Sequence, residues 1–155
     1  MRSVVPADAV LESMVDEGDL DGLFAQVTID DVAAAWCRYS SRVRDYEHHD
    51  DDRDWWARSL FMSNEIYLRS DLHRALLLKL VEYADEPGLL AAVGAGPLED
   101  FISDNDDDLR WLERECSTNA KLRQALSSVW AKVSEPTFVR LDAAAGSVLE
   151  RPRDI

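Results

Sequence analysis

The sequence contains few of the residues that break helices or cross-link small domains. Its 155 residues include only six glycines, five prolines and two cysteines. This composition excludes a collagen-like or low-complexity chain, and 46% hydrophobic with 31% charged residues is typical of a folded protein. Cys37 and Cys116 stand far apart and outside any zinc-binding spacing, so we expect two buried thiols and neither a metal site nor a disulfide framework.

Long hydrophobic runs are also missing. The best candidate, residues 89–98, is interrupted by glycine and proline and is well short of the roughly 20 apolar residues that span a bilayer. Near the N-terminus, Pro6 and Asp8 interrupt the short apolar run before the core of a signal peptide could form. We therefore expect a cytoplasmic protein with no membrane contact.

Positive charge is scarce. The chain has 17 Lys and Arg against 31 Asp and Glu, a formal net charge of −14. Nucleic acid and anionic lipid would be repelled by such a chain, so neither is expected as a partner. A basic protein partner fits the charge better.

Apolar residues recur at helical spacing along most of the chain, and no run alternates with the period of a half-buried strand. This pattern predicts an all-α fold, a compact array of antiparallel helix pairs arranged as a bundle or as a short HEAT-like stack of α-hairpins. We expect one domain over residues 1–155, with residues 1–27 as an N-terminal helical extension and residues 146–155 as a frayed tail.

The start of one helix is marked especially clearly. Thr28 is placed as an N-cap, Asp31 as its capping-box partner at N3, and Val27 and Val32 as a hydrophobic staple. Trp36 and Trp130 are expected to face the core, and Thr118 to cap a helix that ends near Val133. The remaining expected helices cover residues 7–17, 20–26, 55–67, 70–83, 87–93, 107–116 and 136–145.

Two glycines and a proline interrupt the apolar run at Gly94, Gly96 and Pro97. Gly94 suits the left-handed residue after a helix, Gly96 and Pro97 suit the N-cap and first turn of the next helix, and Glu99 then falls at N3. The pattern predicts a tight corner between two helices. A phosphate-binding loop is the alternative, but no strand precedes it, and Pro97 and Glu99 remove a donor and add negative charge.

Part of the sequence resembles a known family. The residues that carry the resemblance are Trp55, Trp56, the block around Gly94, Gly96, Pro97, Leu98 and Glu99, and a segment that ends at Trp130. Over residues 54–130 the chain is similar to a bacterial family of unknown function with a GAGPLE core. The resemblance implies a small α-helical bacterial protein and no particular activity.

Histidines and acids cluster in residues 48–54. Only sets such as Asp45, His49 and Asp52, or His48 with Asp52, could converge if this segment were helical. Such a set would suit a metal-dependent hydrolase, but no HExxH motif completes it, and a solvated loop is the simpler interpretation. We expect His73 to be an exposed or capping residue.

A second acidic stretch has the ligand spacing of an EF-hand calcium loop. Asp104, Asp106, Asp108 and Glu115 supply the oxygens, but Leu109 stands where that loop needs glycine. The acids equally suit the cap and first turn of a helix. Cys116 would end that helix, where the dipole does not activate a thiol, so no nucleophile is predicted.

With no catalytic residue, metal or cofactor predicted, the charge directs the functional hypothesis. We expect a non-catalytic interaction module, of the immunity or antitoxin type, that neutralises a basic partner. The alternatives are the hydrolase built on residues 48–54 and a helical scaffold or homodimer with an exposed tryptophan face that includes Trp55 or Trp111. The acids at residues 16–21 add to the negative surface, and the partner-binding candidates are Asp50, Asp51, Asp52, Asp54, Asp104, Asp106, Asp107 and Asp108.

Overall fold

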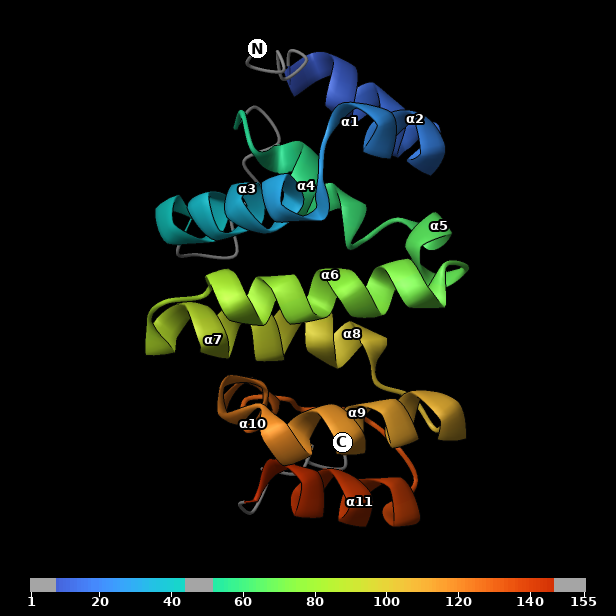
Figure 1. The fold of residues 1–155 in the computed structure, drawn as a ribbon, viewed down its shortest axis with the longest axis vertical. Coiled ribbons are helices and arrows are strands. Elements are labelled where there is room, and N and C mark those ends of the chain that lie inside the picture. Colours follow the sequence, from blue (N-terminus) through green and yellow to red (C-terminus); the bar gives the residue numbers. More distant parts are fainter. Residues whose placement is uncertain (1–7, 44–51, 147–155) are drawn as a thin grey trace. The chain divides into compact units, whose positions relative to one another are not determined.

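The computed structural model describes residues 8–43 and 52–146, and within these ranges the chain is helical with no strand. The predicted all-α fold is confirmed. The chain divides into two compact units, Met1–Tyr83 and Ala84–Ile155, which are treated separately below (Figure 1). The expected single domain stays a prediction. None of the described helices is long and apolar enough to cross a membrane.

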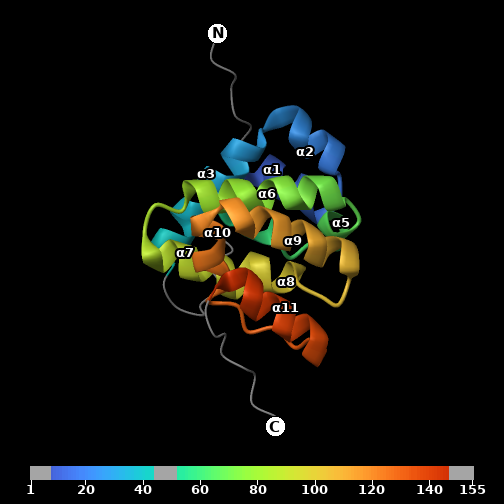
Figure 2. The same cartoon turned by 60° about the horizontal axis from the view of Figure 1, so that its bottom comes forward.

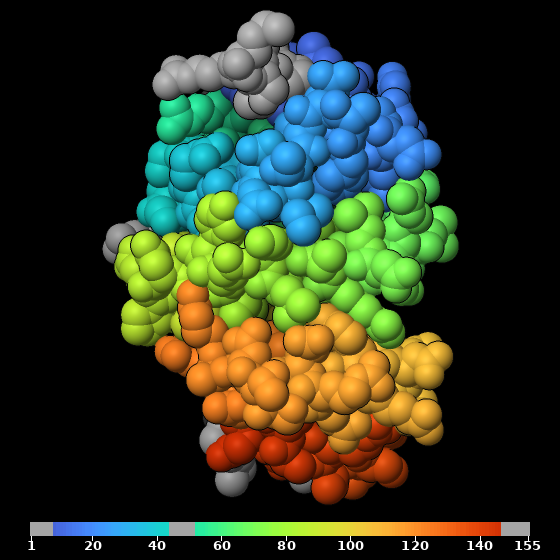
Figure 3. All heavy atoms as spheres, viewed as in Figure 1, coloured from blue at the N-terminus to red at the C-terminus, as the bar shows by residue number. Residues whose placement is uncertain are grey.

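In the first unit, α3 and α6 pack against each other, and α1 packs against α2 and α4. On the face drawn in Figure 3, side chains fill the space between the ribbons of α3 and α6. Fully buried Val32, Leu76, Leu77 and Leu80 belong to these two helices. The helices of this unit are α1 (Asp8–Asp16), α2 (Leu20–Gln26), α3 (Ile29–Arg42), α4 (Trp55–Leu60), α5 (Asn64–Tyr67) and α6 (Ser70–Tyr83).

The capping box predicted at Thr28 is present. The Thr28 hydroxyl accepts a hydrogen bond from the Asp31 amide at 3.1 Å, and the Asp31 carboxylate accepts one from the Thr28 amide at 2.8 Å. These bonds satisfy two backbone donors that the helix cannot pair internally. The helix ends at Arg42.

The single helix expected over residues 55–67 is wrong, because the chain breaks it into α4 and α5. Ser63 adopts an extended backbone with ψ 144°, and its hydroxyl donates to the Leu60 carbonyl at 2.7 Å. A serine side chain that bonds locally in this way competes with the helical backbone ladder. The break turns Met62 and Tyr67 outward, with 43% and 44% of their surface exposed.

The second unit contains the rest of the helices. α10 packs against α7, α9 and α11, and α9 also packs against α11, as Figures 1 and 2 both show. Its elements are α7 (Pro87–Val93), a π-helical turn η1 (Gly94–Leu98), α8 (Glu99–Phe101), α9 (Asp106–Thr118), α10 (Ala120–Leu126) and α11 (Glu135–Ala145). The expected last helix after Pro136 is therefore present, and Gly146 ends it with φ +70°.

The corner predicted at GAGPLE is wrong, because the chain continues through it as a helical turn. Gly94 has φ −63° and ψ −49°, not the left-handed conformation, and Pro97 lies inside η1. The Glu99 amide donates to the Gly94 carbonyl five residues earlier, the pattern of a π-turn. The longer turn accommodates a proline that has no amide to donate and would clash in an ordinary α-turn.

The end of α10 also differs from the prediction. The helix stops at Leu126, not near Val133, and its N-cap is Asn119, whose side chain accepts from the Leu122 amide at 3.0 Å, in place of Thr118. After it, the Trp130 amide donates to the Glu99 carboxylate at 2.6 Å. This tertiary bond to Glu99, which was expected at the N3 position of a new helix, ties the non-helical segment after α10 to α8.

Candidate functional site

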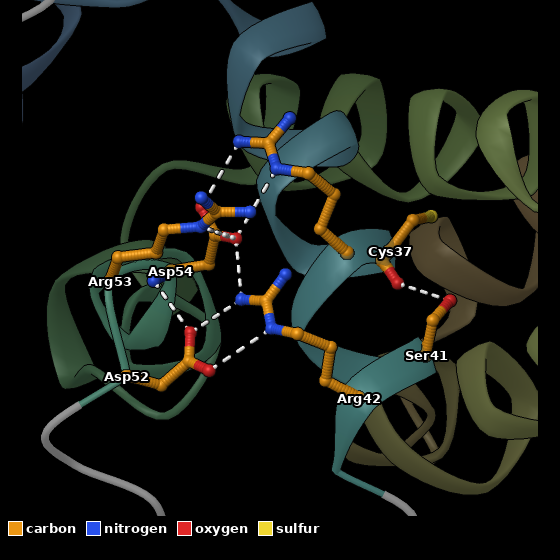
Figure 4. A network of polar contacts seen from close by, with 7 residues as sticks. Cys37, Ser41, Arg42, Asp52, Arg53 and Asp54 are labelled. Carbon is orange, nitrogen blue, oxygen red and sulfur yellow. Dashed lines mark hydrogen bonds and ion pairs between the residues drawn. The ribbon is translucent and has the colours of Figure 1, made fainter.

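Two of the predicted acidic candidates form a partly buried ion-pair network at the end of α3. Arg38 and Arg42 are four residues apart and so share a helix face. Arg38 makes a bidentate contact with Asp54, Nε to Oδ2 at 3.2 Å and Nη2 to Oδ1 at 3.0 Å. Arg42 makes a bidentate contact with Asp52 at 3.2 and 2.6 Å and also donates to Asp54 at 2.7 Å, as the close view of Figure 4 shows.

The network holds its carboxylates in the ionised form. Asp54 is only 3% exposed, and this burial opposes ionisation, but the hydrogen bonds and charges of Arg38 and Arg42 outweigh it and lower its pKa. The hydrogen bond from Arg42 likewise lowers the pKa of Asp52. Both carboxylates are hydrogen-bonded to arginines of α3, and these contacts link the segment before α4 to α3. Asp54 is therefore paired within the protein and does not form part of an acidic surface.

The rest of this candidate cluster comprises two histidines and two aspartates. His48, His49, Asp50 and Asp51 lie outside the described residues. Over residues 8–43 and 52–146, no group of three His, Cys, Asp or Glu side chains is arranged to hold a metal ion. The expectation that the chain binds no metal therefore stays a prediction, as does the hydrolase alternative.

The acidic stretch before α9 is taken up by helix capping and ion pairing. The Asn105 side chain caps α9 by accepting from the Asp108 amide at 3.0 Å, and Asp104 accepts from the amide and hydroxyl of Ser134 at 3.0 and 2.8 Å. Leu109 is buried inside the helix. The segment is thus a helix start and not a calcium loop.

Asp106 is the branch point of a second ion-pair network. It contacts Arg110 and Arg140, each at 2.8 Å, and Arg140 also contacts Glu113. The hydrogen bond from Arg140 lowers the pKa of Asp106, while Asp107 is exposed at the first turn of α9. Of the candidates in this stretch, Asp104 is therefore bonded to Ser134, directly before α11, and Asp106 is paired with Arg140 of α11.

Several single residues lie elsewhere than the sequence predicted. His73 is 3% exposed and not on the surface, because its ring packs edge-on against Tyr67 with centroids 5.2 Å apart. Trp130 is 52% exposed and not in the core, while Trp111, proposed for an exposed tryptophan face, is buried against Phe101.

The remaining motif residues have structural positions. Trp56 and Leu98 are buried, and Trp55 is half-buried beside Tyr39, with ring centroids 5.8 Å apart. Burial raises the pKa of the Cys116 thiol to about 11, which keeps it protonated and unreactive at neutral pH.

The acidic turn between α1 and α2 remains in solvent. Asp16, Glu17, Asp19 and Asp21 are all exposed, and Asp19 also caps α2 through the Gly22 amide at 2.9 Å. This turn lies beside α5, since the Glu65 side chain lies against Gly18, and Arg69, which follows α5, contacts Asp21 of α2 at 3.2 Å. The nearby Leu68 is 77% exposed. Helical periodicity gives no signal for this exposure, because it does not predict the break at Ser63.

Comparison with known proteins identifies a family. A family model, described as a family of unknown function (DUF6869), matches residues 44–148, more than half of the chain. No curated protein and no solved structure matches the chain. The matched range contains α4 to α11 and leaves out the acidic turn between α1 and α2.

Proposed function

Because the chain belongs to a family of unknown function, DUF6869, we propose its function from its own residues. We propose a non-catalytic protein-interaction module, of the immunity or antitoxin type, that neutralises a basic protein partner by covering a cationic surface. The net charge of −14 favours such a partner and opposes binding to nucleic acid.

The observation that carries the proposal is the difference between the acidic segments. Asp52, Asp54, Asp104 and Asp106 are bonded to groups within the protein. In the turn between α1 and α2, Asp16 and Glu17 are exposed to solvent, where their field can steer a cationic protein toward them. Negative charge that the fold does not use internally is what an interaction module needs.

The finer parts of the family resemblance belong to this proposal. A bacterial origin, a GAGPLE core that marks the family, and a cytoplasmic location all fit a protein that restrains a partner made in the same cell. The residues around Gly94 and Glu99 then have a structural role, because their contacts are with Ala125 and Trp130 of the same unit.

Co-purification at two salt concentrations tests the proposed function. The bait is the full chain, and the probe is the protein encoded by the neighbouring reading frame, captured at about 0.05 M and about 0.5 M NaCl. We expect capture at low salt that falls at high salt, and weaker capture by the variant with Asp16→Asn and Glu17→Gln. No capture, or capture that neither salt nor the variant alters, would contradict the proposal.

A further inference from the structure

Three exposed apolar side chains gather on the short segment around α5. Met62 is 43% exposed, Tyr67 44% and Leu68 77%. We call Met62, Tyr67 and Leu68 the α5 surface. A single exposed leucine is ordinary in a soluble protein, but three large exposed apolar side chains within seven residues of sequence single out this segment as a candidate contact.

The backbone of the α5 surface is fixed by a buried side chain and by local hydrogen bonds. Ile66 is fully buried, and the amides of Leu68 and Arg69 donate to the carbonyls of Glu65 and Ile66 at 3.1 and 3.2 Å. The Tyr67 ring rests against the buried His73 ring. Side chains fixed before binding lose little conformational entropy when a partner covers them.

Negative charge lies next to this patch. The Glu65 side chain lies directly against Gly18, in the turn between α1 and α2, and Arg69 is paired with Asp21 of α2. Figure 3 shows the α1 and α2 segment, in blue, beside the green residues around α5 at the right edge. The exposed acids Asp16, Glu17 and Asp19 belong to the same turn, so the α5 surface has an acidic border on this side.

We propose that the α5 surface binds a cationic amphipathic segment of a partner protein. The apolar side chains of this segment contact Tyr67 and Leu68, and its basic side chains contact the acidic border. This inference rests on the proposed function and specifies which kind of segment the partner uses for binding. A second copy of the chain is disfavoured as the occupant, since it would bring one acidic border against another. An anionic surface is disfavoured for the same reason.

Synthetic peptides test this proposal on the full-length protein. The first probe is a lysine and leucine peptide with leucines at helical spacing, and its control has serine at every leucine position. We expect the leucine peptide to bind more tightly by about tenfold or more, and to perturb the amide resonances of Met62 to Asp71 and of Gly18.

Two matched variants test whether peptide binding depends on the α5 surface or on any exposed apolar side chain. Leu68→Ser is expected to weaken binding of the leucine peptide by about tenfold, because this side chain is the most exposed of the three. The control Val139→Ser removes a 56% exposed aliphatic side chain from α11 of the other unit and is expected to change affinity by less than about twofold. Thermal unfolding of both variants checks that they stay folded.

The outcomes distinguish this inference from the proposed function. If both peptides bind equally and the perturbed resonances spread over other acidic segments, the α5 surface is overturned while an acidic interaction module stands. If neither peptide binds and the neighbouring protein is not captured, both proposals fail. Concentration-dependent sedimentation that Leu68→Ser abolishes would assign the α5 surface to a second copy and overturn the inference.

Discussion

Gly94 shows how a single residue can be required by a neighbouring helix and not by its own backbone angles. Its φ of −63° is open to any amino acid, so conformational freedom is not the reason for glycine here. A Cβ at this position would overlap the backbone carbonyl oxygen of Ala125, in α10. Backbone atoms held in a helix cannot move aside easily, so close packing of η1 on α10 requires the missing side chain.

We predict that Gly94→Ala destabilises the protein by roughly 1–3 kcal/mol, the usual range for overpacking a core. The matched control is Gly96→Ala, two residues away, where a Cβ would meet no atom within 4 Å. Because alanine favours helix, the control is expected to stabilise by about 0.5–1 kcal/mol. Urea unfolding measures both, and equal effects would refute the close-approach explanation.

At the scale of elements, Asp54 joins two helices that the sequence separates by a loop. It stands directly before α4, while Arg38 and Arg42, which both donate hydrogen bonds to it, lie on α3. The carboxylate is buried, but the side chains of Arg38 and Arg42 are 51% and 37% exposed. Solvent screening therefore limits the contribution of the network to a fraction of a fully buried ion pair.

We predict that Asp54→Asn lowers the free energy of unfolding at pH 7 by about 1–2 kcal/mol, since charged hydrogen bonds are lost but are screened. The folded pKa of Asp54 lies below its ordinary value of 3.8. Its stabilisation is therefore present above that value and is lost as the pH falls through the folded pKa.

The free energies of unfolding of the wild type and of Asp54→Asn should converge when urea unfolding is repeated from pH 7 down to about pH 3. Asp107→Asn, at an exposed position in α9, serves as the control and should leave the unfolding midpoint unchanged at pH 7. A difference between wild type and Asp54→Asn that stays constant over this pH range would show that the carboxylate charge is not what stabilises the contact.

For the whole molecule, the dominant property is its excess of negative charge. With a net charge of −14, the carboxylates that are not paired repel one another in the folded state. The ion pairs of Arg140 and Lys79 relieve part of this repulsion, but they are largely at the surface and individually weak. Self-repulsion is the term that added salt changes most.

We predict that NaCl raises the thermal unfolding midpoint by a few degrees between about 0.01 M and about 0.5 M, because screening weakens repulsion more than it weakens the exposed ion pairs. The variant with Asp16→Asn and Glu17→Gln carries less charge and should show a smaller rise. Calorimetry measures both midpoints, and a midpoint that falls with salt would mean that the ion pairs dominate.

Local features were predictable from the sequence, and distant contacts were not. The capping box of Thr28 and the bounds of α2 involve residues a few positions apart, so their spacing is sufficient to identify them. The burial of His73 and the exposure of Trp130 depend on Tyr67 and on the helix break after Leu126. Helical periodicity alone assigns such residues to the wrong face, because it assumes that each helix continues.

The sequence by itself determined an all-helical chain, its clearest helix starts and its large negative charge, since each follows from composition or from neighbours within one turn. Only the tertiary structure decided which carboxylates are bonded to distant groups of the protein and which face solvent. Asp54 and Asp104 meet partners 16 and 30 residues away, whereas the acids at residues 16–21 border the α5 surface. Folding brings such distant groups together, and no spacing along the chain encodes that choice.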